Sequence, residues 1–180
     1  IYPDNAPTSF PKPGAVWDAV DAYQPNNGAP VGRGSHRRAG ETQSIVDRAR
    51  RSAADLLGAP SPQHVVFTSN GTDSLNLAIH GLLVPGDHVV ATALEHNSVL
   101  RPLRTRHDQG GIEVTIVFPN DRGIIEPEAI KDALQANTRL VAVTHASNVT
   151  GVIQPIAEIA DAARAGGAIV LVDAAQTAGH

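Results

Sequence analysis

The chain has 180 residues, a formal net charge of −4 at pH 7 and a sequence pI of about 6.0. That length suits one well-buried core rather than two domains, and the acidic balance argues against a nucleic-acid or anionic-membrane surface. The chain has no cysteine, which excludes disulfides, thiolate metal sites and a cysteine nucleophile within these residues. No apolar run approaches the roughly 18 residues of a membrane span. We therefore expect a cytoplasmic protein without a membrane partner, a nucleic-acid partner or a metal site.

The first 40 residues are rich in proline, glycine and asparagine, a composition that predicts an extended arm around one short helix at residues 14–23. After Gly40 the hydrophobic pattern alternates between helical and strand periods. We predict helices at residues 41–57, 72–83, 97–107, 127–136 and 155–165, and strands at residues 64–68, 88–92, 112–118, 140–144 and 168–172. No hairpin signal separates these elements, so the pattern predicts an α/β fold with a mainly parallel sheet and helices on both faces.

Small and polar residues occupy the turn between the first predicted strand and its helix. The first amides of a helix lack internal partners, and together with the helix dipole they favour an anion such as phosphate. Gly71 and Thr72 are the candidate donors. The alternative is that Asn70 or Thr72 only caps the helix.

Two ionisable residues, Glu95 and His96, follow the strand at residues 88–92. The imidazole of His96 suits stacking on a flat ring, acid or base chemistry, or a cap for the helix that begins near Asn97. Glu95 is the rival catalytic group, although we expect a surface position for it.

The strand at residues 140–144 leads into a turn that contains Asn148 and Gly151. An asparagine amide offers both a donor and an acceptor, which suits a carboxylate or a phenolic oxygen. The alternative is a turn closed by the Asn148 side chain, with Gly151 relieving the backbone.

The apolar run at residues 168–172 ends in Asp173, and Gln176 follows in the next turn. A carboxylate at a buried strand end needs a partner, because an unpaired charge there costs several kcal/mol. No lysine or arginine lies nearby in sequence, so a distant cation or a protonated ligand nitrogen must pair with it. A structural salt bridge or helix cap is the alternative.

The ends of four predicted strands thus place a phosphate-binding turn, an imidazole ring that can stack, an amide and a carboxylate at one edge of the sheet. A phosphate, a planar ring and a basic ring nitrogen together describe pyridoxal 5′-phosphate.

At these positions the sequence resembles the class V aminotransferase-like pyridoxal-phosphate enzymes, and within them the cysteine desulfurase and selenocysteine lyase branch. The resemblance covers essentially the whole chain. It is carried by Tyr2-Pro-Asp-Asn-Ala-Pro-Thr-Ser9, Arg33-Gly-Ser-His36, Phe67-Thr-Ser-Asn-Gly-Thr-Asp73, Leu94-Glu-His-Asn-Ser98, His145-Ala-Ser-Asn-Val-Thr-Gly151 and Val172-Asp-Ala-Ala-Gln176.

The resemblance implies a role for each candidate residue. Gly71 and Thr72 would bind the cofactor phosphate, and His96 would stack on the pyridine ring. Asp173 would hold the ring nitrogen protonated, which makes it and His96 the catalytic candidates. Gln176 would bond to the phenolic oxygen, and Asn148 would lie near that oxygen or the substrate carboxylate.

The same resemblance places the family's Schiff-base lysine beyond His180, together with the desulfurase cysteine and the arginine for the substrate carboxylate. The two lysines of this chain, Lys12 and Lys131, match no family motif. We therefore expect an incomplete fold-type I large domain that is inactive alone, with residues 1–40 as an arm, residues 41–180 as part of the large domain, and the small C-terminal domain absent.

The function implied for the parent protein is release of sulfur from cysteine, or selenium from selenocysteine, to give alanine. The expected partners are a cysteine-like substrate, a sulfur-acceptor protein and a second subunit in a homodimer. Another class V reaction (transamination, epimerisation or other carbon–sulfur lysis) and a non-catalytic fragment are the alternatives.

Overall fold

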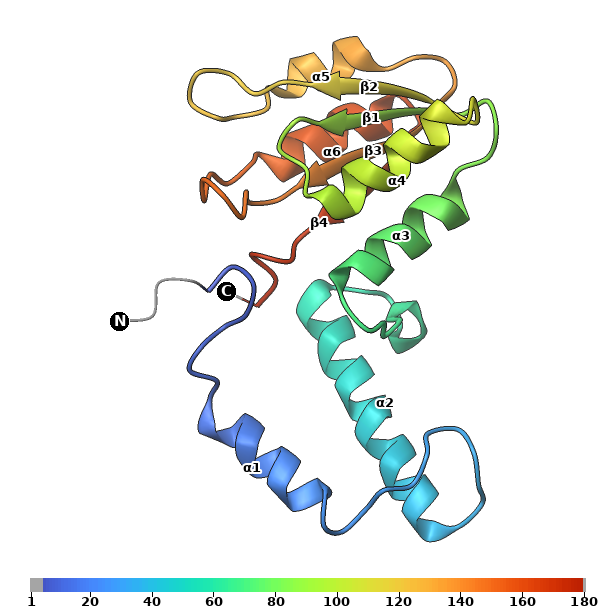
Figure 1. Ribbon diagram of the computed structural model, residues 1–180, viewed down its shortest axis with the longest axis vertical. Helices are drawn as coiled ribbons and strands as arrows, with labels where there is room; N and C mark the ends of the chain where they lie inside the picture. Colours follow the sequence, from blue (N-terminus) through green and yellow to red (C-terminus); the bar gives the residue numbers. More distant parts are fainter. Residues whose placement is uncertain (1–4, 180) are drawn as a thin grey trace. The chain divides into compact units, whose positions relative to one another are not determined.

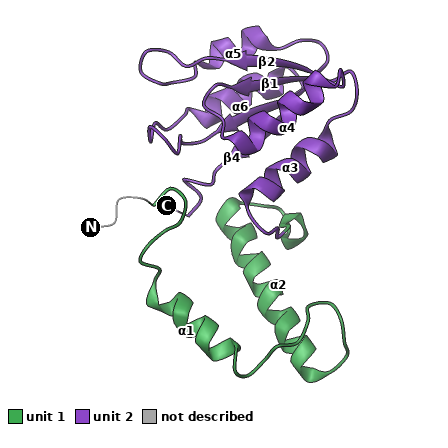
Figure 2. Ribbon diagram, in the orientation of Figure 1, with its two compact units in different colours: residues 1–66 green, residues 67–180 purple. Residues whose placement is uncertain are grey.

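A computed structural model describes residues 5–179, so the first part of the Tyr2–Ser9 motif and His180 lie outside the described residues. The chain forms two compact units, Ile1–Val66 and Phe67–His180 (Figure 2). None of the helices in the described part of the chain is both long enough and apolar enough to cross a membrane.

The first unit contains two helices, α1 (Gly14–Tyr23) and α2 (Arg37–Leu57), and a short 3₁₀ turn, η1 (Pro62–His64). Helix α1 lies where the sequence predicts it. Helix α2 begins four residues earlier than predicted because the His36 side chain caps it, accepting a hydrogen bond from the Ala39 amide at 3.3 Å. It ends at Gly58, which has a left-handed backbone with φ of 65°.

The predicted strand at residues 64–68 is wrong. The chain turns there instead, and the Val65 amide donates to the Pro62 carbonyl at 3.1 Å. The apolar side chains of Val66 and Phe67 are 64% and 51% exposed. A β-branched and aromatic run favours a strand only where a neighbouring strand and a packed face receive it. None of the strands among the described residues pairs with residues 64–68.

The second unit is a four-stranded parallel sheet in the order β2-β1-β3-β4, with helices on both faces (Figure 1). This confirms the predicted α/β class. Its elements are α3 (Gly71–Leu82), β1 (His88–Thr92), α4 (Asn97–Asp108), β2 (Glu113–Val117), α5 (Pro127–Ala133), β3 (Thr138–Thr144), α6 (Ile156–Ala165) and β4 (Ile169–Asp173).

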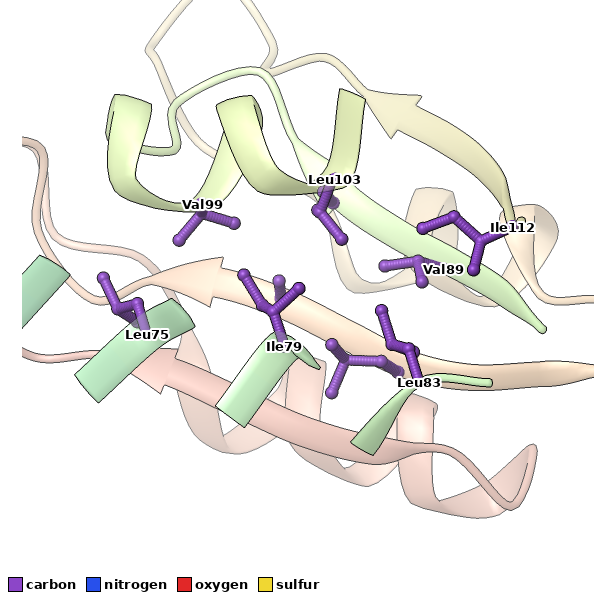
Figure 3. Close-up of a cluster of buried hydrophobic side chains, with 10 residues drawn as sticks. Leu75, Ile79, Leu83, Val89, Val99, Leu103 and Ile112 are labelled. Atoms are coloured by element: carbon purple, nitrogen blue, oxygen red, sulfur yellow. The ribbon is translucent and has the colours of Figure 1, made fainter. Parts of the chain in front are cut away.

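Alternate side chains of each strand point to opposite faces of the sheet, and each face has its own core. On one face, Val89 of β1 packs with Leu75 and Ile79 of α3 and with Val99 and Leu103 of α4 (Figure 3). On the other face, α5 and α6 pack on the sheet through a second cluster whose largest fully buried members are Val90, Ile125, Ile130, Val141, Val143 and Ile159. Two covered faces explain why the middle residues of the central strands, 89–91 of β1 and 140–143 of β3, are all apolar.

The strand order reverses between β1 and β3. From β1 the chain crosses to β2 on one side, and it then returns to place β3 on the other side of β1. In open α/β sheets ligands bind outside the carboxyl ends of the strands at such a reversal. The fold therefore marks the carboxyl ends of β1 and β3, with β4 next to them, as the place to look for a site.

Candidate functional site

Three of the four predicted segments leave the sheet at this edge. His96 follows β1, Asn148 follows β3, and Asp173 is the last residue of β4. The fourth segment, which contains Gly71 and Thr72, opens α3 without a preceding strand. It still reaches the edge, because the Thr72 hydroxyl lies 2.8 Å from the hydroxyl of Ser98 in the first turn of α4.

The N-terminus of α3 is capped by Asn70, whose side-chain oxygen accepts from the Asp73 amide at 2.8 Å. This confirms the capping role that the sequence offered as an alternative to anion binding. The two roles are compatible, because a cap satisfies only one of the free amides of the first turn. Open space surrounds Gly71, since a Cβ built there would have no atom within 4 Å, so a ligand has room to approach this backbone.

His96 caps α4. Its Nδ1 accepts from the Ser98 amide at 3.1 Å and lies 2.7 Å from the Ser98 hydroxyl. A nitrogen that accepts from an amide carries no proton, so the proton of the neutral ring is on Nε2. The capping role is thus confirmed, and the ring itself is exposed.

Ser98 connects two of the predicted residues, because its buried hydroxyl contacts both His96 and Thr72. Sequence reasoning did not single it out. The available signal was a hydroxyl residue two positions after a histidine cap, where it can reach back to the ring. The hydroxyls of Thr72 and Ser98 and the His96 ring therefore form one hydrogen-bonded chain between the first turns of α3 and α4.

A groove of about 470 Å³ runs between α3 and α4 beside this chain of hydrogen bonds, and Thr72, His96 and Arg101 are among the residues that line it. Arg101 adds a positive charge to a groove that already offers hydroxyl groups. No sequence pattern singles out this arginine, because one cation on an amphipathic helix usually marks a solvated face.

The turn after β3 is closed by Ser147 and not by Asn148. The Ser147 hydroxyl accepts from the amides of Val149 and Thr150, each at 3.2 Å, and Gly151 has a positive φ of 73°. The sequence interpretation that Asn148 closes its own turn is therefore wrong, while the assignment of a special backbone to Gly151 is confirmed. The Asn148 side chain is exposed and takes no part in a hydrogen bond with the described residues.

Asp173 is half-buried at the end of β4, and its Oδ1 accepts from the Ala175 amide at 3.0 Å. None of the ion pairs between described residues involves Asp173. The structural salt bridge that the sequence left open is thus absent from the part of the chain that the structure describes. Gln176 is half-buried in the turn that follows.

Glu95 is buried, with 6% of its surface exposed, so the expectation of a surface position is wrong. The turn after β1 directs its side chain back over the sheet, where Oε1 accepts from the Thr92 hydroxyl at 2.6 Å and from the Thr144 amide at 2.7 Å. The pKa of Glu95 is raised to about 7. Desolvation by burial is the largest cause and the negative charge of Asp173 adds to it, while the two hydrogen bonds oppose the rise.

Relatives of known name match nearly the whole chain. A probable cysteine desulfurase from Synechocystis is 35% identical over 184 residues, covering 100% of this chain and 44% of that protein. A probable cysteine desulfurase from Methanothermobacter thermautotrophicus is 37% identical over 182 residues, with the same two coverages. The chain therefore spans a little under half the length of these relatives.

Solved structures agree with the sequence relatives. The apo structure of a cysteine desulfurase from Thermococcus onnurineus superimposes with a TM-score of 0.92 at 37% identity, covering 100% of this chain and 45% of that one. The family profile named aminotransferase class-V matches residues 1–180. Because that match extends over the full chain, the chain belongs to the aminotransferase class-V family.

Proposed function

We propose that the whole protein is a pyridoxal-phosphate-dependent cysteine desulfurase, which releases sulfur from cysteine and leaves alanine. The single observation that carries the proposal is Asp173, a half-buried acid at the carboxyl edge of the sheet that forms no ion pair with the described residues. A half-buried carboxylate of this kind calls for a cation, and a protonated pyridine nitrogen is one. The names of the relatives support cysteine as the substrate.

The residues at the edge fit this cofactor. We assign its phosphate to the first turn of α3. Gly71 leaves open space there, and Thr72 adds a hydroxyl group to the same turn. The exposed ring of His96 is the stacking surface, held in place by the two bonds to Ser98. Hydrogen bonding to two groups keeps an aromatic ring in one orientation, which is the positioning that a stacking residue needs.

The polar groups of the cofactor are assigned to the other two strand ends. Asp173 binds the ring nitrogen and keeps it protonated, and Gln176 donates to the phenolic oxygen. Asn148, exposed beyond β3, lies near that oxygen or near the substrate carboxylate. When bound, pyridoxal phosphate supplies the electron withdrawal that weakens bonds at the substrate α-carbon, while the protein supplies position and electrostatics.

We assign the lysine that binds the cofactor to a part of the whole protein outside residues 1–180. Lys12 bonds locally, to the Thr8 hydroxyl and the Ser9 carbonyl, and Lys131 pairs with Glu128 at 3.4 Å on the surface of α5. Both lie in segments that match no family motif. A homodimer, a sulfur-acceptor protein, an arm at residues 1–40 and a large-domain assignment for residues 41–180 complete the proposal.

The test is turnover of cysteine by the whole protein, purified with pyridoxal phosphate and again after the cofactor has been removed. We expect alanine and sulfide in equal amounts from the loaded protein in the presence of a thiol, and neither from the stripped protein until cofactor is restored. Uptake of cofactor without alanine formation would assign a different class V reaction. Failure to take up cofactor at all would contradict the proposal.

A further inference from the structure

We propose that Glu95 is a positioning residue that works as a neutral acid: it ties β1 to β3 at the strand reversal, holds a proton on Oε2, and leaves Asp173 as the negative charge at that edge. The link to catalysis rests on the proposed function, because it assumes that Asp173 binds the ring nitrogen. The protonation state of Glu95 is a property of the fold and can be tested without the cofactor.

The position of the proton follows from the hydrogen bonds of the other oxygen. Oε1 receives two donors, the Thr92 hydroxyl from β1 and the Thr144 amide from β3. In the first bond the Thr92 hydroxyl donates to Oε1, while its oxygen accepts from the Leu94 amide at 3.2 Å. With Oε1 acting only as an acceptor, a proton on this carboxyl group resides on Oε2.

The surroundings of Oε2 favour that proton. It is buried and has no hydrogen-bond partner among the described residues. An ionised carboxylate would leave this oxygen charged, desolvated and unpaired. A neutral carboxyl group loses much less hydration free energy when it is buried. The upward displacement of the Glu95 pKa has this desolvation as its largest cause.

Asp173 lies close to Glu95 through the sheet register. Thr144, whose amide binds Glu95, is the register partner of Asp173 on the neighbouring strand. Two carboxyl groups in such proximity do not ionise equally, and the more buried one keeps its proton. Glu95 is the more buried of the two, since Asp173 is only half-buried.

The other titratable groups at this edge are His96, beside Glu95 in the same turn, and His145, which follows β3. The His96 ring is engaged with Ser98, and Nδ1 of His145 lies 2.9 Å from the Thr177 hydroxyl. The charge that acts on Glu95 is that of Asp173. Arg101 lines the groove on the α3–α4 side and forms no ion pair with Glu95.

The two hydrogen bonds of Oε1 form a bridge between Thr92 of β1 and Thr144 of β3, and this bridge bears directly on the site. The ladder between β1 and β3 ends at the pair Ala91 and Ala142. Two residues further along β3, the Glu95 carboxyl group accepts the hydrogen bond of the Thr144 amide. It therefore fixes the segment of β3 that lies beside Asp173 and leads to Asn148. Loss of the bridge would misplace both residues, and small misplacements of this kind cost about 100-fold in rate.

The experiment compares Glu95→Gln, Glu95→Ala and the matched control Glu158→Gln in the whole protein loaded with pyridoxal phosphate. Glutamine keeps the acceptor at Oε1 and places an N–H donor where the protonated Oε2 stands. We expect Glu95→Gln and the control to retain kcat/KM within about threefold, and Glu95→Ala to lose about 100-fold. An equal loss in Glu95→Gln and Glu95→Ala would overturn the neutral-acid assignment, because a required negative charge is the property that both variants remove.

A second readout does not depend on the cofactor. The folded-state pKa of Glu95 is raised above its ordinary 4.5 to about 7. Its stabilisation is therefore fully present below pH 4.5 and is lost as the pH rises through 7. Relative to Glu95→Gln, the wild-type protein should lose thermal stability between about pH 5 and about pH 8. A difference between the two proteins that does not change with pH would overturn the proposal, whereas failure to turn over cysteine with this pH dependence intact would count only against the proposed function.

Discussion

Asp173 occupies the last position of a strand whose neighbours supply no cation among the described residues. Its hydrogen-bond partners there are backbone amides, since Oδ1 accepts from the Ala175 amide and the backbone carbonyl accepts from the amide of His145, which follows β3, at 2.9 Å. These bonds fix the direction of the carboxylate without neutralising it. A ligand nitrogen that approaches the free oxygen would find a preorganised anion, which is the arrangement that stabilises charge at least cost.

Replacing Asp173 with alanine tests that role. We expect kcat of the whole protein to fall by about 10²–10³, because removal of a preorganised charged group typically costs this much, while part of the cofactor stays bound through its phosphate. Asp161→Ala on the surface of α6 is the matched control, since its pair with Arg164 is long, at 4.0 Å, and exposed. Steady-state assays with cysteine measure both variants, and near-normal turnover by the Asp173 variant would refute the assignment.

The positions of Asp173 and His96 at or after strand ends could be predicted because each residue stands at the junction of an apolar run and a helix or turn. Such junctions can be located from hydrophobicity alone, whereas the roles of the two residues stay predictions. Glu95 shows where this reasoning stops. A charged residue in a turn is normally exposed, and nothing in Leu94-Glu-His reveals that the side chain folds back to reach the Thr144 amide. The contact joins residues 49 positions apart, and only the strand order brings them together.

At the scale of the elements, β1 is the strand that holds the sheet together, and His88 at its first position ties it to both neighbours. The fully buried ring places Nδ1 2.8 Å from the Thr138 hydroxyl of β3 and Nε2 2.9 Å from the Thr115 hydroxyl of β2. Burial lowers the pKa of His88, partly opposed by the charge of Glu113. A neutral imidazole bound at both nitrogens thus closes the end of the sheet opposite to the site.

This burial predicts a loss of stability in acid. The unfolded chain takes up a proton on His88 near its ordinary pKa of 6.5, whereas the folded chain resists protonation until a lower pH. The stabilisation is present above pH 6.5 and is lost as the pH falls through the folded-state pKa. Relative to a variant that lacks this imidazole, we expect the midpoint of chemical denaturation of the wild-type protein to drop as the pH falls below 6.5.

His88→Val removes that dependence. The variant should be less stable at about pH 8, by about 1–3 kcal/mol, because two threonine hydroxyls lose their partner. The difference between its denaturation midpoint and that of the wild-type protein should shrink as the pH falls below 6.5. His64→Val is the control, because His64 is exposed in η1. Parallel pH curves for wild type and His88→Val would show that His88 does not carry the effect.

Helices and strands of the second unit were predictable to within a few residues because their patterns are long and periodic. The strand at residues 64–68 was not, since its three apolar residues give a local preference that only pairing can satisfy. Helix α5 is also shorter than predicted and ends at Ala133. There the Gln135 amide donates to the Thr138 hydroxyl at 2.7 Å, so the chain turns early into β3, which begins two residues before the predicted start.

At the scale of the whole molecule, the second unit alone brings three predicted site segments to one edge of the sheet. The chain spans 44–45% of the two sequence relatives and the solved structure named above, and the site residues at this edge are those that we assign to holding the cofactor. The lysine, the sulfur-carrying group and the substrate carboxylate site are assigned to the whole protein. This division separates two questions, whether the cofactor is held as proposed and whether cysteine is the substrate.

The most direct measurement of how the cofactor is held is the ¹⁵N chemical shift of the ring nitrogen in the whole protein reconstituted with ¹⁵N-labelled pyridoxal phosphate. We expect a protonated ring nitrogen in the wild-type protein near neutral pH, a protonated nitrogen in Asp161→Ala, and an unprotonated nitrogen in Asp173→Ala. An unprotonated ring nitrogen in the wild-type protein, or a shift that is unchanged by Asp173→Ala, would contradict the claim that Asp173 pairs with the cofactor.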